Sequence, residues 1–166
     1  STVELTLTNN VKNDQAVTVA YTDPSGSNDS NAIQDSAGND AASLTSTSVT
    51  NNSTVAGTAP TFSSAATNSD GTKVVLTYNE ALSSTTATAS TFAVTTGGAA
   101  NAVTAVAISG STVELTLTTA VTNDQAVTVA YSDPSAANDS NAIQDSAGND
   151  AASLTSTAVT NNSTVA

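Results

Sequence analysis

The chain has 166 residues, of which 14 are acidic and two are basic, so its formal net charge at pH 7 is −12. It contains no cysteine, methionine, tryptophan or histidine, which excludes disulfides, thiolate nucleophiles, imidazole bases and histidine-ligated zinc. The negative charge argues against nucleic acids and anionic membranes as partners, because both are bound through basic patches. No apolar run approaches the roughly 18 residues that a membrane-inserted helix needs.

The first third of the chain is repeated at its end. Residues 1–56 align with residues 111–166 without a gap, and only seven of the 56 positions differ. The offset is 110 residues, which is therefore the length of one repeat unit. Pro60 follows a polar stretch with no strand pattern, so we place a unit boundary near Gly57. The sequence predicts one complete unit, residues 57–166, preceded by the C-terminal half of another.

In residues 1–56 we expect about three strands, with one apolar face that nothing in the segment covers. This face comprises Val3, Leu5, Leu7, Val17, Val19 and Tyr21. Residues 57–110 occur once and can complete a sandwich with either copy of the repeated half, so one copy stays unsatisfied. We expect strand complementation between copies, giving a dimer or a head-to-tail filament. The alternative is a fragment cut from a longer array, in which the neighbouring unit is absent and lattice or symmetry contacts cover the face.

The chain as a whole has a β composition. Serine and threonine make up 55 of the 166 residues; threonine favours strands, and both are weak helix formers. Alternating or apolar stretches predict seven short strands in the complete unit. They cover residues 61–67, 74–78, 91–96, 102–108, 113–118, 126–131 and 155–161.

Turn signals separate these stretches at roughly ten-residue spacing, as in an immunoglobulin-like fold. They include "NSDG" at 68–71, "GG" at 97–98 and "DPS" at 133–135. The fold class we predict is all-β: an antiparallel Ig-like (Greek-key) sandwich of about seven strands per repeat. A right-handed parallel β-helix is the main rival, but it needs short glycine-marked coils, which the sequence lacks.

A long polar connection precedes the last strand and is rich in oxygen ligands. Residues 133–150 hold four of the eight acids of the complete unit, several amides and no basic residue. Ca²⁺ takes six to eight oxygen ligands from carboxylates, amides and carbonyls. The candidate ligands are Asp133, Asp139, Asp145, Asn149 and Asp150, with the copies Asp23, Asp29, Asp35, Asn39 and Asp40.

A second interpretation of this connection is equally compatible with the sequence. The spacing matches neither an EF-hand nor the glycine-rich calcium nonapeptide. The same residues would also form a solvated loop in which aspartates and asparagines make Asx-turns and Gly148 supplies a positive φ. The sequence leaves both interpretations open.

The chain is not expected to be an enzyme. Glu80 and Glu114 are the only glutamates of the complete unit. Glu114 falls on the polar face of an expected strand and Glu80 follows a strand end, which is typical of solvated surface. No nucleophile and base can be paired from the residues present.

The complete unit resembles a known repeat family. The segments "TAPTFSSAATNSDGTKVVLTYNEAL", "VTAVAISGSTVELTLTTAVTNDQAVTVAYSDP" and "NAIQDSAGND" are similar to the SWM repeat, a flagellar-system-associated repeat of giant bacterial surface proteins, and to bacterial Ig-like adhesin domains. The resemblance implies a tandem array on a secreted or cell-surface protein, often stiffened by calcium. Asp145, Gly148 and Asn149 match the D-x-A-G-N element of these repeats.

Two functions follow. The first is a structural extender of a bacterial cell-surface adhesin or extracellular filament, with other copies of the repeat as partners. The second is an Ig-like module that binds a glycan or a protein, which needs an exposed aromatic platform or a polar groove. The chain has five aromatic residues, and the strand alternation assigns them mainly to the core. The sequence therefore favours the structural function.

Overall fold

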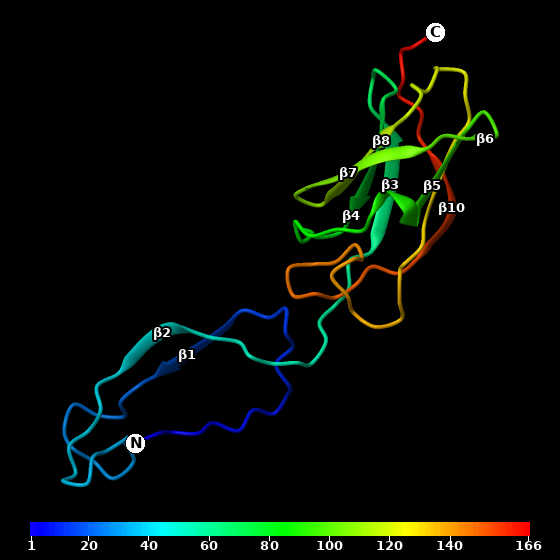
Figure 1. Ribbon diagram of the computed structural model, residues 1–166. Coiled ribbons are helices and arrows are strands. Elements are labelled where there is room, and N and C mark those ends of the chain that lie inside the picture. Colours follow the sequence, from blue (N-terminus) through cyan, green and yellow to red (C-terminus); the bar gives the residue numbers. More distant parts are fainter. The chain divides into compact units, whose positions relative to one another are not determined.

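The structure is a computed structural model that describes all 166 residues. The chain divides into two compact units, Ser1–Ala56 and Gly57–Ala166 (Figure 1). The regular secondary structure of both units is β-strand, and the one helical element is the short 3₁₀ turn η1 (Ala89–Thr91). No helix has the length and apolarity needed to cross a membrane.

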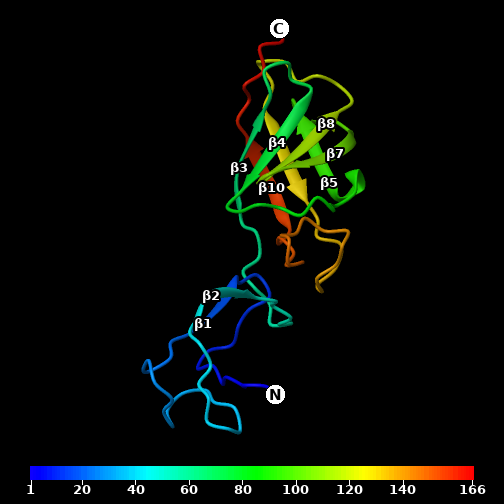
Figure 2. The ribbon, with the colours of Figure 1, turned by 90° about the vertical axis from the view of Figure 1, so that its left-hand side faces the viewer.

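The C-terminal unit is a sandwich of two four-stranded antiparallel sheets (Figure 2). The first sheet has the order β3 (Phe62–Thr67), β4 (Lys73–Tyr78), β8 (Thr112–Leu117) and β7 (Val103–Ser109). The second has the order β10 (Leu154–Val159), β9 (Val127–Tyr131), β5 (Phe92–Thr96) and β6 (Ala99–Ala100). The predicted all-β antiparallel fold is confirmed, and all seven expected strands are present.

Side-chain alternation builds the core between the sheets. Every second residue of β4, β8 and β9 is buried, which is the period of a strand with one covered face. The rings of Phe92 and Tyr131 pack with centroids 5.2 Å apart, and Phe62 meets Tyr78 edge-on at 6.1 Å. These aromatic rings lie in or against the core and leave no exposed platform in this unit.

Strands from the two halves of the unit interleave. We call residues 57–110 the front half and residues 111–166 the back half. Strand β8 of the back half lies between β4 and β7 of the front half, and β9 pairs with β5 of the front half. Neither half therefore holds a complete sheet, because each sheet contains strands from both halves.

One turn requires glycine. Gly71 closes the β3–β4 hairpin with φ +68°, and a Cβ placed on it would lie 2.2 Å from the carbonyl oxygen of Val121. The amide of Val121 donates to the carbonyl of Gly71 at 2.9 Å. Any side chain at this position would separate the hairpin from the segment that leads into β9.

The N-terminal unit has fewer strands than its sequence predicts. It contains only the hairpin of β1 (Val17–Tyr21) and β2 (Leu44–Val49). The stretch 2–7, identical to β8, is not a strand, and Val3, Leu5 and Leu7 are 60%, 63% and 59% exposed. The expectation of about three strands was wrong here, because both neighbours of β8 come from a front half and this unit has none.

Candidate functional site

The polar connection between β9 and β10 is tied to the end of the sandwich. The hydroxyl oxygen of Tyr131 accepts a hydrogen bond from the amide of Ile143 at 3.0 Å, in the buried interior. The amide of Ala151 donates to the carbonyl of Ile143 at 2.7 Å, and the amide of Asp133 donates to Ser153 Oγ at 2.9 Å. These bonds bring the two ends of the connection together beside the last residue of β9.

Three of the predicted ligands meet there. Oxygens of Asp133, Asp139 and Asp150 all lie within 4.8 Å of one another. Asp139 accepts hydrogen bonds from the amide of Asn141 and the hydroxyl of Ser135, each at 2.8 Å. The amide of Asp139 donates to Asp150 Oδ2, also at 2.8 Å. The loop thus fixes the carboxylates in position by its own hydrogen bonds.

Two carboxylate oxygens of this aspartate cluster have no hydrogen-bond donor. Asp133 Oδ1 and Asp150 Oδ1 are shielded from solvent and accept no hydrogen bond from the protein, whereas buried polar atoms normally have a partner. Burial, followed by the negative charges of Asp133, Asp139 and Asp145, raises the pKa of Asp150 above its usual value. Hard, partly shielded oxygens without a neighbouring base suit a divalent cation.

The other two predicted ligands lie outside this cluster and bond to each other. Asp145 Oδ1 accepts the amides of Ala147 and Asn149 at 2.8 and 2.9 Å, and Asp145 Oδ2 accepts Asn149 Nδ2 at 2.7 Å. Both residues are almost fully buried, and Asn149 Oδ1 accepts the amide of Gly57 at 3.1 Å. Gly148 between them has φ +84°. This pair forms an Asx-type turn that anchors the first residue of the unit, apart from the aspartate cluster.

The N-terminal unit repeats the arrangement. Asp23, Asp29 and Asp40 bring their oxygens within 4.8 Å of one another, and Asp35 accepts Asn39 Nδ2 at 2.8 Å. Hydrogen bonds from Ser25 and Asn31 lower the pKa of Asp29. Those from the side chain and backbone of Asn39 lower that of Asp35.

One amide side chain distinguishes the two clusters. In the N-terminal unit, Gln34 Nε2 donates to Asp40 Oδ1 at 2.7 Å. In the C-terminal unit, Gln144 Nε2 instead donates to the carbonyl of Asp139 at 2.9 Å, which leaves Asp150 Oδ1 without a donor. The C-terminal cluster therefore keeps two shielded carboxylate oxygens without a donor, whereas the N-terminal cluster keeps one, Asp23 Oδ1.

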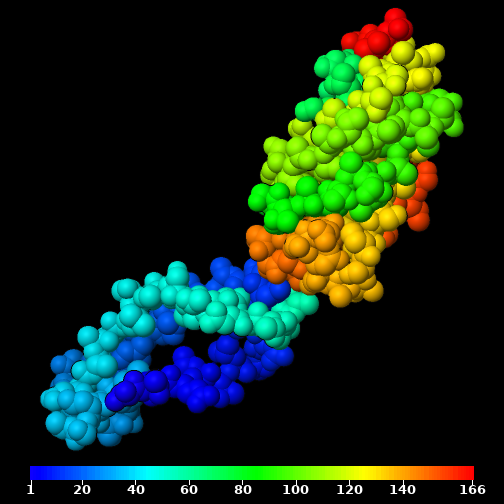
Figure 3. Space-filling view, viewed as in Figure 1, coloured from blue at the N-terminus to red at the C-terminus, as the bar shows by residue number.

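An apolar groove in the N-terminal unit is the second candidate site. It runs between the stretch 2–7 and the hairpin β1–β2, and Figure 3 shows the hollow beside the dark blue N-terminal residues. The apolar residues that line it are Val3, Leu5, Leu7, Val17, Val19, Ala20, Tyr21, Ile33, Leu44 and Val49. Sequence alternation identified six of these ten residues. The four that it missed are Ala20, Ile33, Leu44 and Val49. Ile143, Leu154 and Val159, the copies of the last three, lie in or against the core.

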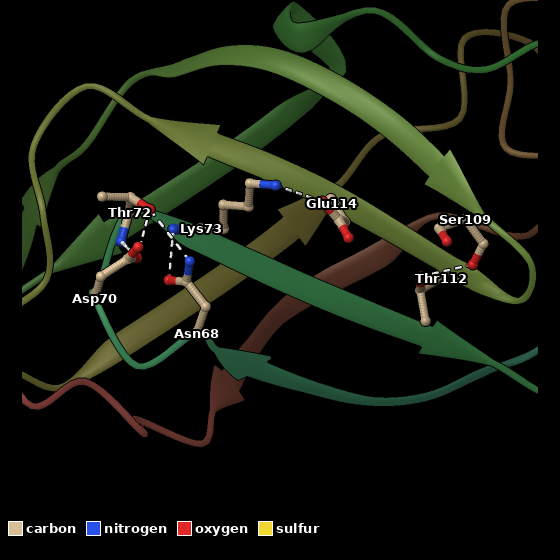
Figure 4. Close-up of polar contacts among 7 residues, drawn as sticks. All are labelled: Asn68, Asp70, Thr72, Lys73, Ser109, Thr112 and Glu114. Carbon is tan, nitrogen blue, oxygen red and sulfur yellow. Dashed lines mark hydrogen bonds and ion pairs between the residues drawn. The ribbon is translucent and has the colours of Figure 1, made fainter.

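The outer surface of the first sheet carries an ion pair. Lys73 Nζ lies 2.6 Å from Glu114 Oε2, between β4 and β8 (Figure 4). Asn68 and Asp70 shape the preceding turn: Asn68 Oδ1 accepts the amide of Lys73 at 2.9 Å, and Asp70 Oδ1 accepts the amide of Thr72 at 3.0 Å. Glu114 thus links β8 to β4 through this ion pair and lies on the polar face that the strand alternation predicted.

Comparison with known proteins gives one family and two solved structures. The family model of the SWM repeat, described as "Putative flagellar system-associated repeat", matches residues 1–26 and 55–136. Most of the β9–β10 connection lies outside the match. No curated protein matches the chain.

Both solved structures belong to the bacterial S-layer protein SbsC. The N-terminal part of SbsC is 22% identical over 62% of this chain and 23% of that one, with a TM-score of 0.49. For rSbsC(31-844) the identity is 22%, the shares are 61% and 13%, and the TM-score is 0.48. The chain thus spans less than a quarter of the length of either structure.

Proposed function

The chain belongs to the SWM repeat family, and we propose that it is a structural repeat that gives length to a bacterial cell-surface or extracellular assembly. The observation that carries the proposal is the path of the chain through the complete unit. The amide of Gly57 is bound beside the β9–β10 connection, at the end of β9. The last residues of the chain bind ahead of the start of β9, where the amide of Asn123 donates to the carbonyl of Val165 at 2.7 Å.

Entry and exit at opposite ends suit a unit that is added in series. The C-terminus lies at the far end of this unit from the β9–β10 connection (Figure 1). Each further unit joined in this way would extend the array by the length of a sandwich instead of folding back on it.

The residue inventory supports a structural role over a binding or catalytic one. The large aromatic side chains of the complete unit serve the core, so they offer no stacking platform for a glycan. The chain contains no cysteine or histidine, and the one lysine of the complete unit is engaged with Glu114. The proposed function therefore includes no enzymatic activity.

Location tests the functional proposal directly. Antibodies raised against this chain should label the outside of intact producing cells in immunogold electron microscopy, and external protease should remove the label. Labelling that appears only after permeabilisation, with the chain protected in intact cells, would contradict a role at the surface. A glycan array probed with the chain tests the alternative binding function.

We propose further that Ca²⁺ binds the cluster of Asp133, Asp139 and Asp150 and stabilises the unit. The two shielded carboxylate oxygens supply part of the coordination, and backbone carbonyls and water would complete it. A bound cation offsets the repulsion among the three carboxylates. Asp145 and Asn149 hold the loop and are not ligands in this proposal.

Removal of the ion is the test of this site. The thermal midpoint of the C-terminal unit should be higher in millimolar Ca²⁺ than in EDTA, since a free ion at 100 times its Kd adds about 2.7 kcal/mol. The increment should shrink as the pH falls through the raised pKa of Asp150, because the ion requires the deprotonated carboxylate. Equal midpoints in both buffers would refute the proposal.

Matched substitutions separate binding from general charge effects. A double variant with Asp40→Asn and Asp150→Asn should lose the rise in thermal midpoint that Ca²⁺ causes. Without Ca²⁺ the same change should leave stability unaltered or slightly higher, since it relieves repulsion. Asp14→Asn with Asp124→Asn changes the net charge equally at corresponding positions outside the clusters and should keep the increment. Loss of the increment in both pairs would point to nonspecific screening.

A further inference from the structure

The C-terminal unit shows what covers a back half. Strand β8 is paired along both edges: Leu115 lies opposite Val74 of β4 and opposite Val106 of β7. Val113 and Leu115 are completely buried, and Leu117 is 7% exposed. The front half thus supplies both neighbours of this strand, and through β5 it also supplies one neighbour of β9.

The N-terminal unit has the same residues without that cover. The stretch 2–7 pairs with no strand, and β1 pairs only with β2, so the edge that corresponds to the β5 side of β9 is open. Unpaired backbone edges beside an apolar groove form a template for strand addition. Apart from Thr18, the residues that line the groove are apolar, and so is the core face of the front half.

The charge at one position of the N-terminal unit also complements that of a front half. Lys73, the only basic residue of residues 57–110, pairs with Glu114. The counterpart of Glu114 in the N-terminal unit is Glu4. A front half seated in the same register would place a lysine next to Glu4.

Residues 1–166 hold one front half and two back halves. The front half of residues 57–110 pairs with the back half of residues 111–166, so it is not free for the N-terminal unit. A front half for the N-terminal unit would therefore come from another repeat.

We propose that the groove of the N-terminal unit binds a second front half, of the sequence type of residues 57–110, supplied by another repeat. The register follows that of the C-terminal unit: Val74 of the added front half lies opposite Leu5, and Val94 opposite Val19. Residues 2–7 then become a strand paired on both edges. The proposal goes beyond the structural function above, because it names the partner of one face and holds wherever the protein is located.

A chain extended by one front half tests the proposal. A second copy of residues 57–110 is joined directly ahead of residue 1, which reproduces the order of the complete unit. Hydrogen exchange read by mass spectrometry should show residues 2–7 and 17–21 becoming as protected as residues 112–117 and 127–131. The sequence differences at 9, 10, 12 and 22 distinguish peptides of the two copies.

A matched control carries Leu76→Asp and Val94→Asp in the added copy alone. It should leave residues 2–7 unprotected while residues 112–117 keep their protection, which shows that the original unit still folds. The proposal is overturned if the added front half leaves residues 2–7 unprotected, or if the control protects them equally. It is also overturned if the unmodified chain protects them by forming a concentration-dependent dimer, since the face would then belong to a second N-terminal unit.

Discussion

Residues 1–56 and 111–166 are nearly the same sequence in two different structural states. In the second copy, residues 112–117 form the central strand β8 and bury their apolar side chains completely or nearly so. In the first copy, the identical residues 2–7 pair with nothing and stay exposed. This strand is therefore specified by its neighbours along the sheet, and its β4 partners lie between 35 residues (Thr77 and Thr112) and 43 residues (Lys73 and Thr116) earlier in the chain.

Other parts of the back half do not depend on the front half. The hairpin keeps its register in both copies, since Val17 faces Val49 just as Val127 faces Val159. The tyrosine bond is also repeated: Tyr21 accepts the amide of Ile33 at 2.9 Å. Local turns and the β-hairpin therefore form from the back half alone, whereas the strand that bridges two front-half strands does not.

Truncating the same leucine in each copy should give the largest difference in stability between the two copies. Leu115→Ala removes a completely buried side chain and should destabilise the C-terminal unit by about 2–5 kcal/mol. Leu5→Ala removes its largely exposed counterpart and should change stability by less than about 0.5 kcal/mol. Urea unfolding followed by circular dichroism measures both; equal losses would show that the N-terminal face is covered in solution.

Removing one hydroxyl tests the tyrosine bond in both copies. Tyr131→Phe leaves the buried amide of Ile143 without its acceptor, which costs about 1–3 kcal/mol. Tyr21→Phe affects a bond in exposed surroundings, so water replaces the lost hydroxyl and the expected loss is smaller. A loss in Tyr21→Phe as large as in Tyr131→Phe would mean that the loop of the N-terminal unit is closed off from solvent.

The same tyrosine predicts a loss of stability in alkali. Burial raises the pKa of Tyr131 to about 12 from its ordinary value of 10. Between these values the unfolded chain loses its phenol proton before the folded unit does, so the free energy of unfolding falls as the pH rises from 10 toward 12. Tyr131→Phe should flatten this part of the pH profile; buried Tyr78, whose pKa is also raised, accounts for the slope that remains.

The sequence predicted those features that alternate or repeat. Seven of the eight strands of the complete unit followed from side-chain period, because one face of each meets the core. Strand β6 was missed, since its two alanines carry no alternation. The strand expected at residues 2–7 was wrong for the opposite reason: its alternation is clear, but no partner lies beside it.

In the β9–β10 connection, composition identified the acids but not their grouping. Asp133 and Asp150 are separated by 17 positions and meet only because Tyr131 and Ile143 fold the loop back. Asp145 and Asn149, which best match a local motif, are engaged with each other instead. Local motifs predicted the turn, whereas the cluster of carboxylates depends on tertiary contacts.

The smallest expected difference between the two copies concerns Glu114, on the outer face of β8, and its counterpart Glu4. Glu114→Gln removes the ion pair with Lys73 and should lower the stability of the C-terminal unit by about 0.2–1 kcal/mol, because both side chains are partly solvated. Glu4→Gln, at the corresponding position of a unit without that lysine, should be neutral or slightly stabilising in a chain of net charge −12.

Salt decides what this difference means. At 1 M NaCl the Debye length falls to about 3 Å, so an electrostatic contribution from the Lys73–Glu114 pair should shrink. The measurement is the free energy of unfolding of both glutamine variants at about 0.05 M and 1 M NaCl. If the loss in Glu114→Gln persists at high salt, the glutamate acts through packing with the lysine stem. The two copies would then differ in side-chain contacts at this position and not in charge pairing.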